Sequence, residues 1–256
     1  MPNLRLGNGA LGLYNESQEV WQANVNQNLQ TIIDNAPAGA VIELAPGSYL
    51  AAIVIDKALA LVCKGAPGSC AIAGIEVLVD DVSLWNVGAF GAAESAYALK
   101  VGDATHSPDR FRSFGGKFEG PDGVAVILKG AGDALFDGSE FCWAGTGLAF
   151  DDNNNGFCTQ IFVQNCRFHN LVDAGVGLIT SGGVVNLHLI DNIFDNDENG
   201  TPPTNYIKVD RAGDTGIVAG NRFACATHEA DVITLAAGLL YVGNYTEAGI
   251  NTARPA

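Results

Sequence analysis

His169 and Asp195 are the two side chains best suited to acid–base chemistry. Each directly follows a phenylalanine, in the phrases VQNCRFH and LIDNIFD, which lie 26 residues apart. If the phrases stack in register, the two side chains lie on adjacent strands about 5 Å apart. A carboxylate beside an imidazole raises its pKa and supports proton transfer, so the pair is a candidate catalytic site. An exposed cross-strand ion pair, worth about 0.2–1 kcal/mol, would have the same pattern.

Three aspartates in the same region suggest a metal site. Asp191, Asp195 and Asp197 lie close together in the sequence, and carboxylate oxygens are the ligands that Ca²⁺ prefers. The alternative is a solvated loop, because Asp197 opens the insertion DENGTPPTN. No other cofactor is expected.

Trp143 is the candidate carbohydrate-binding residue. It lies beside the position that His169 and Asp195 share in the repeat, so its ring is predicted to reach the surface, where apolar sugar faces can stack on it. Trp85 has the opposite parity and is predicted to lie in the core.

An internal repeat must position these residues. Short phrases of alternating apolar residues recur, each ending in an aromatic, and a second apolar run follows about ten residues later. Units of this kind bury their apolar faces only by stacking, which predicts an all-β, single-stranded right-handed parallel β-helix. A β-sandwich is the alternative, and it predicts hairpin turns every 8–12 residues or so instead of aromatics in one phase. The aromatics predicted to stack inside are Phe90, Phe118, Phe141, Phe168, Phe194 and Phe223.

A capping α-helix is predicted before the first strands, because the open core of a solenoid's first turn must be covered. Asn15 and Gln18 suggest a capping box, and Ala36-Pro37 ends the segment. At the other end, GINTARPA offers no comparable cap, so we expect another element, for example a neighbouring subunit, to cover that edge. The predicted organisation is an N-terminal docking segment (1–14), the capping helix (15–36), the β-helix domain (37–250) and a C-terminal tail (251–256).

The chain resembles the pectate-lyase-like right-handed parallel β-helix superfamily over about residues 28–246. The resemblance rests on the phrase NLQTIIDNAPAGAVIELAPGSYLAAIVI and on the repeat phrases VQNCRF, LIDNIF and VAGNRF. It implies the fold but not one function, since the superfamily includes lyases, hydrolases, esterases and bacteriophage virion proteins without catalysis.

The catalytic motifs of the enzymatic branches are incomplete. Asp151-Asp152 suggests the paired aspartates of polygalacturonases, but no Gly-His-Gly accompanies it. The carboxylate that pectin methylesterases place after Gly-x-Tyr is missing, because Tyr49 is followed by Leu-Ala-Ala. These gaps favour a protein without catalysis.

Composition excludes several classes of partner. The net charge of −15 argues against nucleic acid and anionic membranes, which bind surplus Lys and Arg. No stretch approaches the ~20 apolar residues of a membrane span, and no secretion signal is seen.

The six cysteines form no CxxC pair, so buried free thiols are expected, although Cys63 and Cys70 flank a loop that a disulfide could close.

Together these features predict a structural virion protein of a tailed bacteriophage, as a capsid decoration, head fibre or tail protein. It would be located in the phage particle, contact other virion proteins and form a homotrimer, as the resemblance implies. A polysaccharide lyase or glycoside hydrolase acting on an acidic polysaccharide is the alternative. A non-catalytic solenoid that binds a surface glycan is the third hypothesis.

Overall fold

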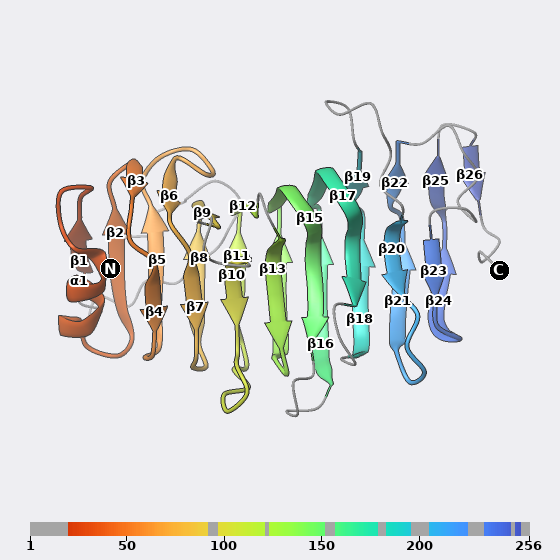
Figure 1. The fold of residues 1–256 in the computed structure, drawn as a ribbon, viewed down its shortest axis with the longest axis horizontal. Coiled ribbons are helices and arrows are strands. Elements are labelled where there is room, and N and C mark those ends of the chain that lie inside the picture. Colours follow the sequence, from red (N-terminus) through yellow and green to blue (C-terminus); the bar gives the residue numbers. More distant parts are fainter. Residues whose placement is uncertain are drawn as a thin grey trace, which may run out of the picture.

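The chain winds into a right-handed parallel β-helix of about eight turns, which confirms the predicted fold class (Figure 1). The computed structural model describes residues 20–91, 97–120, 123–151, 157–178, 183–195, 205–224, 233–246 and 249–251. Stacked strands form three rows along the solenoid. No described helix is long and apolar enough to cross a membrane.

The first row is a ten-stranded parallel sheet. Its strands are β1 (Val20–Ala23), β2 (Ala40–Leu44), β5 (Leu59–Cys63), β8 (Val82–Trp85), β11 (Arg112–Phe114), β14 (Gly132–Asp137), β16 (Cys158–Gln164), β18 (Val184–Ile190), β21 (Thr215–Ala219) and β24 (Gly238–Val242).

The second and third rows share one sheet, because two long strands bend from one row into the other. The second row comprises β3 (Gly47–Tyr49), β6 (Cys70–Ile72), β9 (Val87–Phe90), β12 (Lys117–Glu119), the first halves of β15 (Glu140–Asp151) and β17 (Arg167–Leu178), β19 (Ile193–Phe194), β22 (Arg222–Phe223), β25 (Asn244–Thr246) and the antiparallel β26 (Gly249–Asn251). The third comprises β4 (Ile53–Ile55), β7 (Ile75–Val77), β10 (Tyr97–Val101), β13 (Val124–Lys129), the second halves of β15 and β17, β20 (Asn205–Val209) and β23 (Ile233–Leu235).

A left-handed backbone conformation makes the corner between the first and second rows. Asn, Asp or Gly occupies this corner, because these residues adopt a positive φ at the lowest cost. The corner residues are Asn86, Gly115, Gly138, Asn165, Asp191, Gly220 and Gly243, with φ between 54° and 67°. The corner sets which residues of the next strand point inward.

Five of the six predicted phenylalanines form the internal stack. Phe118, Phe141, Phe168, Phe194 and Phe223 are in register on successive turns and fully buried. The last four rings stack nearly face to face, with centroids 4.4, 4.7 and 5.0 Å apart.

The prediction for Phe90 is wrong. Ala89, and not Phe90, pairs with Phe118, while Phe90 pairs with Glu119 and is partly exposed. The reason is the distance from the corner. The stacked rings lie three residues beyond it, whereas Phe90 lies four residues beyond Asn86 and so points the other way.

A second buried column consists of asparagines that directly follow the corner. The Nδ2 of Asn192 donates to Oδ1 of Asn221 (2.9 Å), and the Nδ2 of Asn221 donates to Oδ1 of Asn244 (2.8 Å). Each of these Oδ1 atoms also accepts a hydrogen bond from a backbone N–H of the preceding turn. Since all three side chains are buried and paired, this ladder joins consecutive turns from inside.

The predicted capping helix is much shorter than residues 15–36. The helix α1 spans Leu29–Asn35, with the side chain of Asn28 accepting from the N–H of Thr31. Residues 20–23 instead form β1, because pairing with β2 adds a full strand to the first row. The expected capping box at Asn15 and Gln18 lies outside the described residues.

The C-terminal end of the second row is covered by the chain itself. Strand β26 folds back antiparallel on β25, with Tyr245 opposite Ile250. The expectation that GINTARPA offers no cap is therefore wrong for this row, because Gly249–Asn251 close its edge as a hairpin, while cover by a neighbouring subunit stays a prediction.

Replacing Asn221 with Ala tests the ladder. Removing this amide leaves buried partners on both neighbouring turns without their hydrogen bonds, at about 1–3 kcal/mol for each unsatisfied group. We expect Asn221→Ala to lower the free energy of unfolding by at least about 2 kcal/mol in urea denaturation. Gln164→Ala, which removes a partly exposed amide from β16, is the control and should change it little. Equal effects of the two substitutions would contradict a structural role for the ladder.

Candidate functional site

Charged and polar side chains gather on the outer side of the second row. The residues just before and just after each stacked phenylalanine point outward, because neighbours on a strand alternate. The resulting group, called here the charged surface, spans successive turns on β12, β15, β17 and the end of β19. It consists of Lys117, Glu119, Glu140, Cys142, Arg167, His169 and Asp195.

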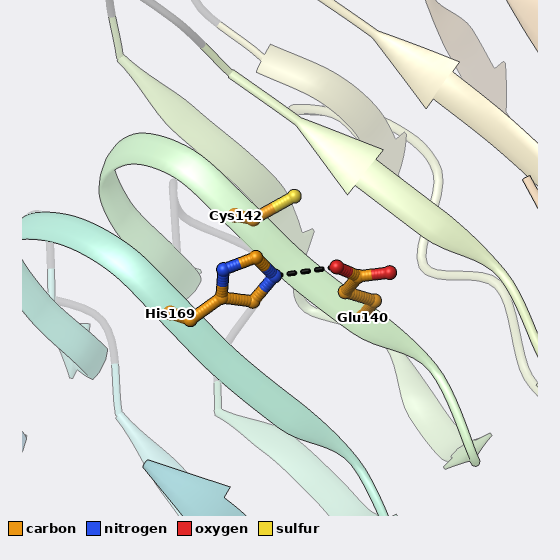
Figure 2. A group of neighbouring side chains, drawn as sticks. All are labelled: Glu140, Cys142 and His169. Atoms are coloured by element: carbon orange, nitrogen blue, oxygen red, sulfur yellow. Dashed lines mark hydrogen bonds and ion pairs between the residues drawn. The ribbon is translucent and has the colours of Figure 1, made fainter. Parts of the chain in front are cut away.

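At the centre of this surface His169 bonds to Glu140. The Nε2 of His169 lies 2.5 Å from Oε1 of Glu140, and both approach Cys142 (Figure 2). The other ring nitrogen, Nδ1, lies 3.0 Å from Nδ2 of Asn170. His169 is only 7% exposed, whereas the Glu140 side chain is 35% exposed. The hydrogen bond with His169 lowers the pKa of Glu140, against the opposing effect of burial.

Two further ion pairs flank this centre. The guanidinium of Arg167 contacts both carboxylate oxygens of Asp195, with Nε 2.9 Å from Oδ2 and Nη2 3.3 Å from Oδ1. Asp195 is 8% exposed and the Arg167 side chain 47%, so the cation faces solvent while its partner is covered. Lys117 lies 2.6 Å from Glu119, and this hydrogen bond raises the pKa of Lys117.

The predicted catalytic residues lie on adjacent turns but have other partners. His169 bonds to Glu140 and Asp195 to Arg167, so the predicted His169–Asp195 contact does not form. Their catalytic role stays a prediction. Sequence reasoning missed Glu140 because it followed only the residue after each phenylalanine. The residue before it has the same parity and would have led to Glu140.

Trp143 is exposed, as predicted for a sugar-stacking ring. It is 42% exposed and has a φ of 51°, at the bend where β15 passes from the second row to the third. Sugar binding there stays a prediction. The core position expected for Trp85 is wrong: its ring lies on the outer side of the first row, partly exposed and stacked on Phe114 with centroids 4.1 Å apart.

The predicted calcium ligands are not gathered among the described residues. Asp191 occupies a corner and is exposed, and Asp195 is paired with Arg167. Asp197 lies outside the described residues, so the calcium site stays a prediction. The group that the structure does bring together is Glu140, Cys142 and His169, whose ligand atoms all lie within 4.8 Å of one another.

The third row places Asp151, another sequence candidate, in a structural contact. Its carboxylate lies 2.9 Å from Nζ of Lys129 on the adjacent strand, and the side chain is almost fully buried. Asp152 lies outside the described residues.

Two of the cysteines are not the free thiols that were expected. Cys63 and Cys70 form a disulfide, because the loop between them brings the two Cα atoms to 5.8 Å. Cys142, Cys158 and Cys166 are buried free thiols, as predicted, and burial raises the pKa of each to about 12. A thiol with such a pKa is a poor nucleophile at neutral pH.

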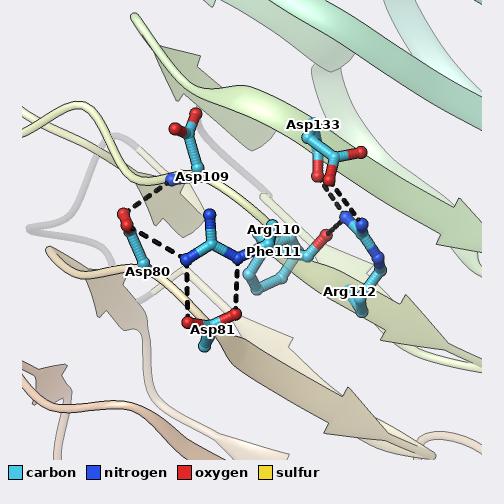
Figure 3. A network of polar contacts seen from close by, with 7 residues as sticks. All are labelled: Asp80, Asp81, Asp109, Arg110, Phe111, Arg112 and Asp133. Atoms are coloured by element: carbon cyan, nitrogen blue, oxygen red, sulfur yellow. Dashed lines mark hydrogen bonds and ion pairs between the residues drawn. The ribbon is translucent and has the colours of Figure 1, made fainter.

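A second charged cluster lies at the start of the first-row strands, and its contacts join successive turns. Arg110 reaches back one turn to both oxygens of Asp81, at 2.7 and 2.8 Å, and to Asp80 at 3.3 Å (Figure 3). Arg112 reaches forward to Asp133 at 2.8 Å. These arginines clamp neighbouring turns and serve as a comparison for Arg167.

The Arg110–Asp81 pair predicts a pH-dependent contribution to stability. The hydrogen bond from Arg110 lowers the pKa of Asp81 below its ordinary 3.8. A carboxyl whose pKa is lower in the folded chain stabilises the fold fully at pH values above 3.8. This stabilisation is lost as the pH falls from 3.8 through the lower pKa of the folded state. We expect Arg110→Ala to be slightly less stable than the wild type at pH 7, since both groups are exposed. Chemical denaturation at a series of pH values should show the difference vanishing below pH 3.8. A difference that grows on acidification would contradict this assignment.

Comparison with solved structures identifies other proteins of this fold. A pectin methylesterase from Aspergillus niger is 13% identical, with a TM-score of 0.60, over 91% of this chain and 87% of its own. A pectin methylesterase in complex with a hexasaccharide is 12% identical, with a TM-score of 0.60, over 94% and 92%. An alginate lyase of family PL6 is 13% identical, with a TM-score of 0.59, over 89% of this chain and 38% of its own. No family model and no curated protein matches the sequence.

These comparisons confirm the resemblance to the pectate-lyase-like β-helix at the level of the fold. They contradict the prediction of a phage virion protein, because chains that share the fold over about nine-tenths of this one are polysaccharide enzymes. Oligomeric state, partners and location stay predictions.

Proposed function

We propose that this protein is an enzyme that acts on an acidic polysaccharide, bound across the charged surface of the second row. The observation that carries the proposal is the half-exposed guanidinium of Arg167, set among charged side chains on successive turns of a fold shared with pectin and alginate enzymes. A linear polymer can follow such a surface, because equivalent positions repeat about every 4.8 Å along the solenoid.

Local cations must carry the recognition of an anionic polymer, because the whole chain has a net charge of −15. Arg167 and Lys117 lie two turns apart on this surface, and both side chains are partly open to solvent. A guanidinium has five N–H donors in a planar fork that suits carboxylates. The half-exposed guanidinium of Arg167 is therefore suited to a uronate carboxylate.

Elimination suits these groups better than hydrolysis. A glycoside hydrolase needs a carboxylic acid whose pKa is raised so that it stays protonated. The His169 hydrogen bond lowers the pKa of Glu140 instead. A lyase removes the proton next to the substrate carboxylate, and a neighbouring cation increases the acidity of that C–H bond by neutralising the carboxylate. Arg167 would be that cation, and the Glu140–His169 pair would take up the proton. As the C=C bond forms, the C–O bond to the neighbouring sugar breaks, and the proton passes to the leaving oxygen.

An assay over a panel of acidic polysaccharides tests the proposal. We expect an ultraviolet-absorbing unsaturated product with at least one polymer, and a loss of about 10- to 100-fold in kcat/KM for Arg167→Ala, because a hydrogen bond to a charged group contributes about 1.5–3 kcal/mol. Arg110→Ala, which breaks an ion pair of similar exposure outside this surface, is the control and should retain full activity. Parallel assays for methanol release and reducing ends would reveal an esterase or a hydrolase.

Two results would contradict this function. One is that no polymer in the panel yields any product, in which case binding without turnover would favour the non-catalytic glycan-binding solenoid. The other is equal activity of Arg167→Ala and the wild type, provided that thermal unfolding shows both to be folded.

Trp143 offers a separate test of where the polymer lies. Its exposed ring sits beside Cys142 at the edge of the charged surface. If a sugar ring stacks on it, Trp143→Ala should raise KM and leave kcat nearly unchanged, because stacking stabilises bound substrate and transition state alike. Trp85→Ala, which removes a partly exposed ring from the first row, should change neither constant. The same KM for the two variants would place the polymer elsewhere.

A further inference from the structure

We propose that Glu140, Cys142 and His169 form a binding site for a zinc ion or a similar borderline-soft divalent metal. One carboxylate oxygen, one sulfur and one imidazole nitrogen converge here, and all three ligand atoms lie within 4.8 Å of one another (Figure 2). The proposal goes beyond the polysaccharide activity and does not depend on it.

The strand register fixes the arrangement of these ligands. Glu140 and Cys142 lie two residues apart on β15 and so face the same side, and His169 on β17 is the direct partner of Cys142 on the next turn. Two parallel strands with continuous pairing at this point hold all three Cα atoms. Ligands on rigid strands need only side-chain rotation to reach a metal.

The required rotation is small. Zinc bonds of about 2.0–2.3 Å in a tetrahedral arrangement place ligand atoms about 3.3–3.7 Å apart. The 2.5 Å contact between His169 and Glu140 must open by about an ångström, and the longer separations within the 4.8 Å limit must close by a similar amount. A metal on Nε2 therefore replaces the Glu140–His169 hydrogen bond.

The donor set and burial select the kind of metal. Nitrogen and sulfur donors favour zinc over calcium or magnesium, which prefer oxygen ligands. Cys142 is fully buried and His169 nearly so, while Glu140 is partly exposed and leaves an approach for the ion and for a water as fourth ligand. Cys142 binds as a thiolate, so its proton passes to solvent when the metal binds.

Asn170 is placed to support the metal-bound ring. When Nε2 of His169 binds a metal, the proton of the neutral ring is on Nδ1. The Asn170 amide lies 3.0 Å from Nδ1, and with its oxygen turned toward the ring it would accept a hydrogen bond from Nδ1–H.

Titration of the tag-free full chain with Zn²⁺ alone, without polysaccharide, tests the site. Reductant is left out and oxygen excluded, so that the Cys63–Cys70 disulfide stays closed and the free thiols stay reduced. We expect one equivalent to bind by calorimetry, and Co²⁺ to give a thiolate charge-transfer absorption. Cys142→Ser should abolish that absorption, and His169→Gln should weaken zinc binding by at least about tenfold. Cys166→Ser, which changes a buried thiol elsewhere in the core, should bind zinc like the wild type.

Absence of zinc binding, or binding unchanged in Cys142→Ser and His169→Gln, would overturn the proposal. If Cys142→Ser does not fold by circular dichroism, His169→Gln and Glu140→Gln, a change at a partly exposed position, decide the result. Affinity retained in both overturns the proposal. Because no polysaccharide is present, this outcome is independent of whether the protein turns over a polymer.

Discussion

The structure depends on the phase of each turn, that is, on how many residues separate each side chain from the left-handed corner. Parallel hydrogen bonding superimposes each strand on the one below, so residues at the same distance from the corner form a column. The phenylalanines lie three residues beyond the corner and the ladder asparagines one residue beyond it. Glu140, Cys142 and His169 are brought together by this same phase, from positions almost thirty residues apart in the chain.

The solenoid was predictable because phenylalanines at nearly constant spacing mark its repeat. Some positions were predicted wrongly because residues were counted along the sequence repeat and not from the left-handed corner of each turn. Phe90 matches the repeat spacing but lies one residue too far from Asn86, so its ring points outward. Residues 20–23 fit an apolar helical pattern, yet pairing with a neighbouring strand overrides that local preference. The positions of His169 and Asp195 followed from the repeat, but their partners did not, because diagonal contacts depend on side-chain length and charge.

Two of the pairs on the charged surface, Arg167–Asp195 and Glu140–His169, combine an exposed partner with a covered one. Asp195 and His169 are nearly buried, whereas Arg167 is half exposed and Glu140 more than a third. Desolvating the inner partner strengthens each pair, while the outer partner keeps donors or lone pairs toward solvent. The exposed arginine clamp at Asp80 and Asp81 lacks this division, since its members have similar exposure. This difference separates a surface suited to binding from one that joins turns.

The stacking of turns also determines where the molecule opens first. Each turn contacts mainly the turns before and after it, so the ends of such an array fray while its middle opens only with most of the array. β15 and β17 have four second-row strands on one side and three parallel ones on the other. We therefore expect amide protons around Glu140 and His169 to exchange among the slowest, so that partial melting from either end leaves this neighbourhood assembled.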